Sequence, residues 1–188
     1  GNDHSASLAN LDNTDDKLST GIGGLAKRLA QGASPAIGPT NVNDDQEWFV
    51  MFCNQNSFRD LKADPILTAA NREARSRNPK SNPIFTDGSE MYNGIIYREI
   101  PEIPNLGNVG AGGIQVGVNF LCGVQAVGVA FAKRATPIMN DTDYKFRKGV
   151  GIMEMRGVEK LQFERPETPG TKVDHGMVTV YTAAVDDA

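Results

Sequence analysis

The sequence predicts an α+β fold, in which helices and strands are mixed without a regular strand–helix–strand alternation. Three observations support this class. Some segments place apolar residues at the spacing of an amphipathic helix, whereas other, shorter segments are continuously apolar or alternate apolar and polar residues. In addition, the 188 residues include 20 glycines and 10 prolines, which predict long loops between the elements.

The composition is that of an ordinary folded protein, with 39% hydrophobic and 22% charged residues. The formal net charge is −4, and basic residues occur only in short clusters between acidic ones. The sequence therefore does not predict a nucleic-acid-binding face. The longest apolar stretch, residues 114–132, is interrupted by glycines and polar residues, so we expect a buried element there and no membrane span.

The first 16 residues are expected to form a flexible segment, because they are mostly small and polar and offer little surface to bury. Residues 17–188 are then expected to form a single α+β domain. The chain starts with Gly1 and not with methionine, so we expect it to be a trimmed part of a longer protein.

A first helix is predicted to start at Thr14-Asp15-Asp16, since a capping residue is followed by acids that suit the positive end of the helix dipole. Gly32 is expected to end it. Apolar residues recur between these limits at Leu18, Ile22, Leu25 and Leu29. Internal glycines weaken such a helix by up to ~1 kcal/mol each relative to alanine. The helix therefore needs tertiary packing, or close approach of a neighbouring backbone, to form.

Residues 33–46 predict an extended connection, and residues 47–53 (Glu-Trp-Phe-Val-Met-Phe-Cys) predict a strand buried on both faces. A short helix follows over residues 57–63. Asp64-Pro65 predicts the start of a further helix that runs to about Arg77, because proline is favoured at the first helical position. The residues expected to point outward on this helix are Arg72, Arg75 and Arg77.

Residues 80–89 are predicted to form a loop and residues 91–100 a strand, in which Asn93-Gly94 is either a bulge or a tight bend. A long loop is expected over residues 101–113. Residues 116–133 carry apolar side chains at helical intervals and favour a helix. A strand stays open as an alternative there, because valine and glycine are frequent.

The last third of the chain predicts short strands separated by loops. Strands are expected at residues 150–155 and 160–163, on either side of a break, and at residues 177–182. Residues 137–148 and 165–172 are expected to be loops, because they contain proline or glycine and polar residues.

No catalytic, cofactor-binding or metal-binding residue is predicted. The histidines are His4, in the polar N-terminal segment, and His175, beside a glycine at a loop-to-strand junction. Cys53 and Cys122 lie in apolar runs, where small buried side chains are expected instead of a disulfide framework or a nucleophile.

Two further patterns fail as ligand-binding motifs. Asp141 and Asp143 lack the glycine and terminal glutamate of a calcium loop, so a solvated turn is expected. The glycine-rich residues 107–113 lack the Gly-Lys-Ser/Thr ending of a phosphate loop, and Gln115 occupies a position that a dinucleotide-binding motif would give to glycine. No Gly-x-Ser-x-Gly hydrolase motif occurs. The sequence thus predicts a structural or binding protein that is not an enzyme and needs no cofactor.

Several segments in the same order resemble one family. They are Leu25-Ala26-Lys27-Arg28-Leu29 with Pro35, Glu47-Trp48-Phe49-Val50-Met51-Phe52, Arg59-Asp60-Leu61 with Asp64, Asn82-Pro83-Ile84-Phe85-Thr86, Tyr92-Asn93-Gly94-Ile95-Ile96-Tyr97-Arg98-Glu99, Leu121-Cys122-Gly123-Val124-Gln125-Ala126 and His175-Gly176-Met177-Val178-Thr179-Val180-Tyr181-Thr182-Ala183-Ala184. In the identity of their residues and in their order, these segments resemble the major capsid proteins of tailed phages of the enquatrovirus type. Within that family, residues 121–126 would be a helix of small residues.

The resemblance implies a Hong Kong 97-like capsid fold. The chain would be a C-terminal portion of such a protein, mainly the axial domain with part of the peripheral domain and a return strand near residues 175–185. It would act as the major capsid subunit of a tailed double-stranded DNA phage or prophage. In that role it would assemble with copies of itself into capsomers of an icosahedral head.

The resemblance also implies partners and a location. Scaffold, portal and decoration proteins are the further partners to expect, together with encapsidated DNA that is enclosed without specific binding. No membrane is involved, and the protein would be found in the virion after a stay in the host bacterial cytoplasm. We also expect the outward Arg72 and Arg75 to pair with acids of a neighbouring subunit.

Two other classes stay open. A compartment-forming or binding protein on the same fold would carry a cargo-binding groove and would form shells without a scaffold or portal. An enzyme is disfavoured because no catalytic constellation occurs, and bound nucleotide, bound metal or hydrolase activity would support it.

Overall fold

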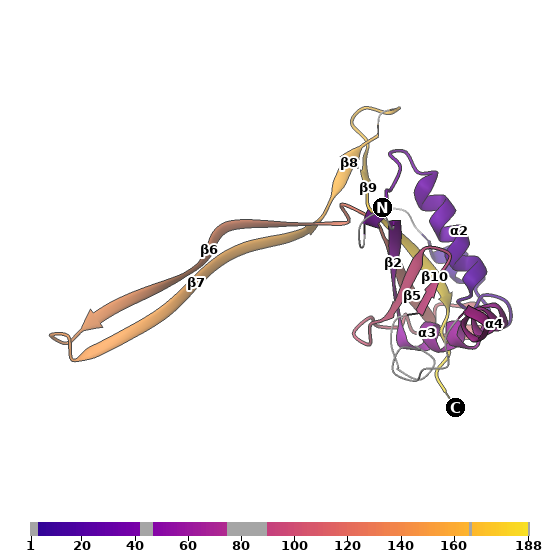
Figure 1. Ribbon diagram of the computed structural model, residues 1–188, viewed down its shortest axis with the longest axis horizontal. Helices are drawn as coiled ribbons and strands as arrows, with labels where there is room; N and C mark the ends of the chain where they lie inside the picture. Colours follow the sequence, from indigo (N-terminus) through magenta and orange to yellow (C-terminus); the bar gives the residue numbers. More distant parts are fainter. Residues whose placement is uncertain (1–3, 42–46, 75–89, 166, 188) are drawn as a thin grey trace. The chain divides into compact units, whose positions relative to one another are not determined.

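The computed structural model describes residues 4–41, 47–74, 90–165 and 167–187. Contacts between α-carbons group the chain into two units: Gly1–Val124 with Gly176–Ala188, and Gln125–His175. The first unit mixes helices with a sheet, and the second consists of paired strands (Figure 1). The α+β class predicted from the sequence is therefore confirmed. That residues 17–188 form one domain after a flexible segment stays a prediction.

The first unit contains a mixed sheet with the strand order β10-β5-β2-β4-β3. Its strands are β2 (Glu47–Cys53), β3 (Glu90–Tyr92), β4 (Ile95–Glu99), β5 (Val116–Cys122) and β10 (Met177–Ala183), and the short β1 (Thr40–Asn41) pairs with the start of β2. The central strand β2 runs parallel to β4 and antiparallel to β5. The C-terminal strand β10 forms an outer edge of the sheet, and its partner among the named strands is β5.

The predicted strand at residues 47–53 is confirmed as β2. On one face of the strand Phe49, Met51 and Cys53 are buried. On the other face Trp48, Val50 and Phe52 are half-buried, and Glu47 at the start of the strand is exposed. The predicted strand at residues 177–182 is confirmed as β10. Between β3 and β4 the backbone reverses at Asn93 and Gly94, which both have positive φ, so the tight bend is the correct alternative.

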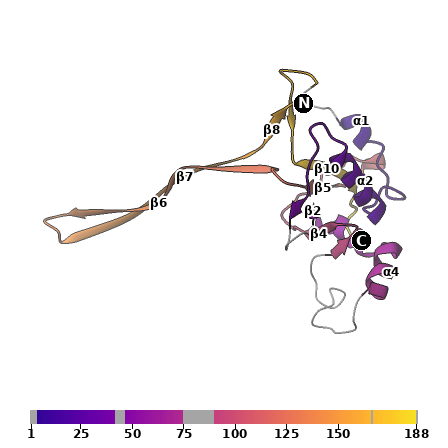
Figure 2. The same ribbon diagram turned by 45° about the horizontal axis from the view of Figure 1, so that its top comes forward.

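The described residues of the first unit include the α-helices α1 (Ser5–Leu8), α2 (Thr20–Gln31), α3 (Gln55–Lys62) and α4 (Pro65–Ala74). The helix α2 lies alongside β10 (Figures 1 and 2). A single core joins helices and sheet, and its largest buried members are Tyr97, Phe49, Phe58, Leu18, Met51, Leu61, Leu67 and Ile95.

Helices α3 and α4 confirm the two helices predicted for residues 57–77, as far as the chain is described. Asp64 caps α4 as predicted, because its carboxylate accepts a hydrogen bond from the Ile66 backbone N–H at 2.9 Å. The predicted end at Arg77 and the predicted loop at residues 80–89 lie outside the described residues.

The predicted helix start at Thr14 is wrong, because α2 begins at Thr20 with Ser19 as its cap. The acids before it form a local turn instead. The Asp12 side chain accepts hydrogen bonds from the backbone N–H groups of Thr14 and Asp15, at 2.8 and 3.1 Å. Aspartate side chains compete with helix formation in this way. Lys17 then forms an isolated bridge with Ala183 of β10.

The predicted helix at residues 116–133 is wrong, and so is the helix that the family resemblance implied at residues 121–126. Residues 116–122 form β5, which is paired on both sides, with β10 and β2. Residues 123–126 turn the chain, with Gln125 at a positive φ. The pairing partners come from distant parts of the sequence, so tertiary contacts override the local spacing of apolar residues.

The second unit contains β6 (Val127–Thr142), β7 (Arg147–Lys160), β8 (Gln162–Glu164) and β9 (Lys172–Asp174). Strands β6 and β7 form a long antiparallel ribbon (Figure 2), and β8 pairs with β9. The predicted loop at residues 137–148 is therefore wrong except at the turn, residues 143–146. The predicted break between two strands at residues 156–159 is also wrong, because β7 is continuous there.

Candidate functional site

No group of three or more histidine, cysteine, aspartate or glutamate side chains that could hold a metal ion occurs among the residues described above. No helix in the described ranges is long and apolar enough to cross a membrane. Cys53 is fully buried in β2, and burial raises the pKa of its thiol to about 12, which opposes formation of a nucleophilic thiolate. His175 packs edge-on against Phe163, with ring centroids 4.7 Å apart.

The glycine-rich loop is held by the chain itself. The backbone N–H of Gly110 donates to the Ile114 carbonyl at 3.0 Å, and the N–H of Ala111 donates to the Leu11 carbonyl at 2.8 Å. These two donors thus serve the fold, and the loop attaches the N-terminal segment to the first unit.

The long ribbon β6–β7 carries an exposed apolar face. Residues directly opposite each other in an antiparallel pair share a face, and Val129 lies opposite Val158, and Met139 opposite Val150. We define the apolar ribbon face by this register as Val127, Val129, Phe131, Pro137, Met139, Val150, Ile152 and Val158. Met139 and Ile152 are 78% and 79% exposed. The face therefore presents two groups of apolar side chains to solvent, and Glu154 and Arg156 lie between them on the same face of β7.

Such an apolar face needs a covering partner. A two-stranded ribbon has no second layer of its own, and isolated hairpins are at best marginally stable in water. Contiguous exposed apolar surface on a protein marks an interaction site. The opposite face of the ribbon is less apolar: Ile138, Met153 and Met155 lie on it, but so do glycines such as Gly149 and Gly151 and polar residues such as Asn140. The asymmetry indicates that one face is built for contact.

The ribbon is basic as well as apolar. Residues 127–160 contain seven basic and four acidic side chains, namely Lys133, Arg134, Lys145, Arg147, Lys148, Arg156 and Lys160 against Asp141, Asp143, Glu154 and Glu159. At its tip Tyr144 and Phe146 are 95% and 87% exposed. Asp143 lies in this exposed turn at a positive φ, and Asp141 precedes it in β6.

Sequence reasoning missed the ribbon. The signal that could have found it is the alternation in Val127-Gly-Val-Ala-Phe131, where every second residue is bulky and apolar. The segment Val150-Gly-Ile-Met-Glu-Met-Arg-Gly-Val158 follows it only in part, because Glu154 and Arg156 interrupt the pattern. Because both segments also contain glycines and sit beside apparent turn residues, they did not stand out as one hairpin.

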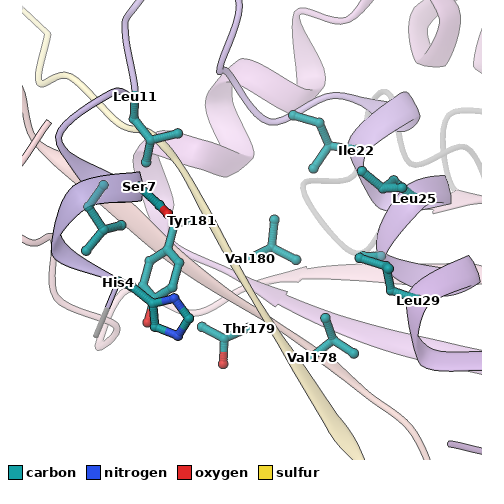
Figure 3. Close-up of a pocket in the computed structure, with 12 residues that line it drawn as sticks. His4, Ser7, Leu11, Ile22, Leu25, Leu29, Val178, Thr179, Val180 and Tyr181 are labelled. Carbon is teal, nitrogen blue, oxygen red and sulfur yellow. The ribbon is translucent and has the colours of Figure 1, made fainter. Parts of the chain in front are cut away.

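The first unit carries a second apolar surface, a groove of about 280 Å³ (Figure 3). Residues 178–181 of β10 form its floor, and the sequence from His4 to Leu11 and the helix α2 form its walls. On α2 the side chains of Leu25 and Leu29 are 48% and 57% exposed, whereas Ala26 and Ala30 of the same helix are buried in the core. The helix therefore has one face in the core and a second apolar face on this groove.

Comparison with known proteins finds phage capsid proteins. The family model described as "Phage capsid protein" matches residues 1–186. No curated protein matches the chain in sequence. Among solved structures, the cyanophage Pam1 capsid shares 37% identity and a TM-score of 0.78, over 97% of this chain and 51% of that one.

More distant structures share the fold. The capsid of Ralstonia phage GP4 is 22% identical with a TM-score of 0.63, over 96% of this chain and 51% of that one. The acid-stable capsid of Helicobacter pylori bacteriophage KHP30 is 15% identical with a TM-score of 0.60, over 95% of this chain and 63% of that one. The chain thus spans about half the length of the first two capsid chains.

Proposed function

The chain belongs to the phage capsid protein family, and from this premise we propose that it acts as a major capsid subunit of a tailed double-stranded DNA phage or prophage. Its fold is the Hong Kong 97-like capsid fold, as expected from the sequence. The role is structural, and the proposed location is the virion, after a stay in the host cytoplasm.

One observation of the molecule supports the proposal most directly, namely the apolar ribbon face. Side chains such as Met139 and Ile152 are almost fully exposed in the single chain. A protein that works as a monomer rarely leaves such a face in water, whereas a shell subunit buries it against neighbouring surfaces. The proposed main partners are further copies of the chain in capsomers.

The charge distribution supports enclosure of DNA without specific binding. The net charge is −4, so the long-range electrostatic interaction of the chain with a polyanion such as DNA is weak or repulsive. Along the sequence of the ribbon, the basic residues occur in short clusters with acidic residues between them, and they form no long basic run. Scaffold, portal and decoration proteins remain proposed further partners of the complete capsid protein.

The test is to purify particles from cells that produce the virus encoding this chain and to quantify their proteins by mass spectrometry. A major capsid subunit should be the most abundant protein of DNA-filled particles. Absence of its peptides, or only a few copies per particle, would refute the proposal. Empty shells that form in uninfected cells around a protein cargo would instead support a compartment protein on the same fold.

A further inference from the structure

The outer strand β10 has an edge that the rest of the sheet leaves open. In its pairing with β5, the N–H of Gly123 donates to the Gly176 carbonyl at 2.8 Å, and the N–H of Ala184 donates to the Gln115 carbonyl at 3.0 Å. Backbone groups along an antiparallel strand alternate in direction. Even-numbered residues of β10 therefore bond to β5, and the odd-numbered residues Met177, Thr179, Tyr181 and Ala183 direct their backbone groups away from the sheet.

The described residues occupy one end of this edge. The N–H of Ala183 donates to the Asp16 carbonyl at 2.9 Å, and Lys17 bridges to Ala183. Within the described part of the chain, the outward backbone groups of Thr179 and Tyr181 have no hydrogen-bond partner. The edge is thus paired at residue 183 and open from residue 181 to residue 177.

The apolar groove lies directly over this open edge (Figure 3). Val178, Thr179, Val180 and Tyr181 form its floor, while Leu25 and Leu29 stand on one side of it. An open row of backbone donors and acceptors between apolar walls is the arrangement that binds an added strand: the backbone supplies hydrogen bonds and the walls receive alternate side chains. The geometry indicates an extended segment as the occupant.

The chain itself carries a strand suited to this groove. The outer edge of β6 is interrupted, because its register shifts between Phe131 and Thr136 and Pro137 has no N–H to donate. The outer edge of β7 has no proline and no register shift of its own. Register shifts and prolines hinder the pairing of an edge, so of the two strands of the ribbon β7 has the edge better suited to pairing.

Charge favours the same pairing. The ribbon that contains β7 carries the excess of basic residues counted above. The groove-lining Leu11 is followed within five residues by Asp12, Asp15 and Asp16, which form an acidic segment. Hydrogen bonds from the backbone N–H groups of Thr14 and Asp15 favour the ionised form of the Asp12 carboxyl and lower its pKa. A basic ribbon is therefore attracted to this acidic segment.

From these observations we infer that β7 of one copy adds as a strand to the open edge of β10 in a second copy. This inference rests on the proposed function and names a contact that such a subunit would use. The β7 edge and the open β10 edge are different surfaces of the same chain. The contact is therefore head-to-tail, and every copy uses each of the two edges once. Contacts of this kind close into rings when the rotation between copies allows it.

Disulfide cross-linking between two proteins that each carry one engineered, exposed cysteine tests the contact. Cys122 is replaced by serine in the full chain, and the buried Cys53 is left in place. Thr179→Cys protein is mixed under mild oxidation with a panel that carries cysteine at single positions of residues 149–154. Heterodimers should form at alternate positions of the panel. Absence of heterodimers over the whole panel, or Thr179→Cys homodimers as the sole product, would overturn the inference.

Proline substitution tests the hydrogen bonds. Thr179→Pro removes an outward N–H that the sheet does not use, and Thr179→Ala keeps it. The apparent association constant of Thr179→Pro should fall at least about tenfold below that of Thr179→Ala, as expected for the loss of about one or two backbone hydrogen bonds. The same comparison of association constants between Ile152→Pro and Ile152→Val tests the hydrogen bonds of β7. It replaces the first test if Thr179→Pro does not fold. Equal association of both pairs contradicts the inference.

The two proposals fail separately. If the chain is the most abundant protein of purified particles but no β7–β10 cross-link forms, the strand addition is refuted and the capsid role stands. If the cross-link forms but the chain is absent from particles, the contact is real and the capsid role is refuted.

Discussion

The carboxylate of Asp64 accepts two hydrogen bonds from Thr20, one from its backbone N–H at 2.7 Å and one from its hydroxyl at 2.8 Å. The other carboxylate oxygen accepts the N–H of Ile66 at 2.9 Å. Thr20 is the first residue of α2 and Ile66 lies in the first turn of α4. One buried side chain therefore satisfies donors at the start of two helices, which ties these helices together.

Replacing Asp64 by alanine should destabilise the protein by about 2 kcal/mol or more, since a single lost helix cap already costs roughly 0.5–2 kcal/mol. The free energy of unfolding from urea titration followed by circular dichroism measures the effect. Asp15→Ala is the matched control, because the Asp15 side chain is exposed and lies outside both helices. Equal losses in the two variants would show that Asp64 does not have this role.

The same carboxylate should make stability depend on pH. Burial acts to raise the pKa of Asp64, but the hydrogen bonds from Thr20 and from the start of α4 outweigh burial and lower it. The contribution of Asp64 is therefore complete above the unfolded value of about 4 and is lost as the pH falls through the lower folded-state pKa. The difference in unfolding free energy between the wild type and Asp64→Asn should shrink between pH 6 and pH 3, as roughly expected from that unfolded value. A difference that is constant or grows towards low pH would contradict this assignment.

Gly23 of α2 makes room for a core side chain. A Cβ atom at this position would overlap the hydroxyl oxygen of Tyr97, which is fully buried. Gly23→Ala should therefore destabilise the fold by about 1–3 kcal/mol through overpacking, in spite of the better helix propensity of alanine. At Gly21 the nearest atom, the Ser19 Oγ, would be 3.7 Å from the added Cβ. Gly21→Ala should be neutral or raise stability by up to ~1 kcal/mol.

A double-mutant cycle identifies the cause of the Gly23 effect. Tyr97→Phe removes the oxygen that a Cβ at residue 23 would overlap, and this hydroxyl has no hydrogen-bond partner among the described residues. Gly23→Ala should thus cost less in the Tyr97→Phe background than in the wild type. A coupling energy near zero would show that the backbone of α2, and not Tyr97, sets the requirement for glycine.

These relationships show how far the sequence reaches. The dipeptide Asp64-Pro65 predicts the cap of α4, because capping depends on neighbouring residues. The bonds from Asp64 to Thr20 cross 44 positions of sequence and depend on tertiary structure, so no local pattern predicts them. The glycines of α2 predicted either tertiary packing or close approach of a backbone, and at Gly23 the first alternative holds, because the neighbour is the side chain of Tyr97.

The apolar surfaces were harder to predict than the core. Val116–Cys122 satisfies helical spacing but forms β5, because strands distant in sequence pair with it on both sides. The ribbon β6–β7 breaks the usual expectation that bulky apolar residues lie inside, and its glycines and Pro137 resemble loop signals. A functional surface is where such a local rule fails, since the residues are selected for a partner that the sequence does not contain.

The arginines of α4 provide a prediction from the sequence alone that stays open. Arg72 is exposed, and Arg75 lies outside the described residues. Reversing both charges with Arg72→Glu and Arg75→Glu should lower the yield of assembled particles and leave the melting temperature of the isolated chain unchanged. Reversing charges that form ion pairs across an interface slows association of the subunits more than it alters their folding. Particles in normal yield would refute the proposed pairing with acids of a neighbouring subunit.

Adjacent residues on the ribbon test which of its faces is the contact surface. Met139 lies on the apolar ribbon face opposite Val150, and Asn140 lies on the other face opposite Gly149. Met139→Asp should reduce self-association by about tenfold or more, because it places an unpaired charge in an apolar contact. Asn140→Asp adds the same charge one residue further on and should have little effect.

Sedimentation velocity over a range of protein concentrations measures both association constants. Met139 is 78% exposed in the single chain, so neither variant should change the free energy of unfolding by more than about 0.5 kcal/mol, the usual range for surface substitutions. A stronger effect of Asn140→Asp would reverse the assignment of the faces. Equal and negligible effects would mean that the apolar ribbon face stays exposed in the assembled protein, which its composition makes unfavourable.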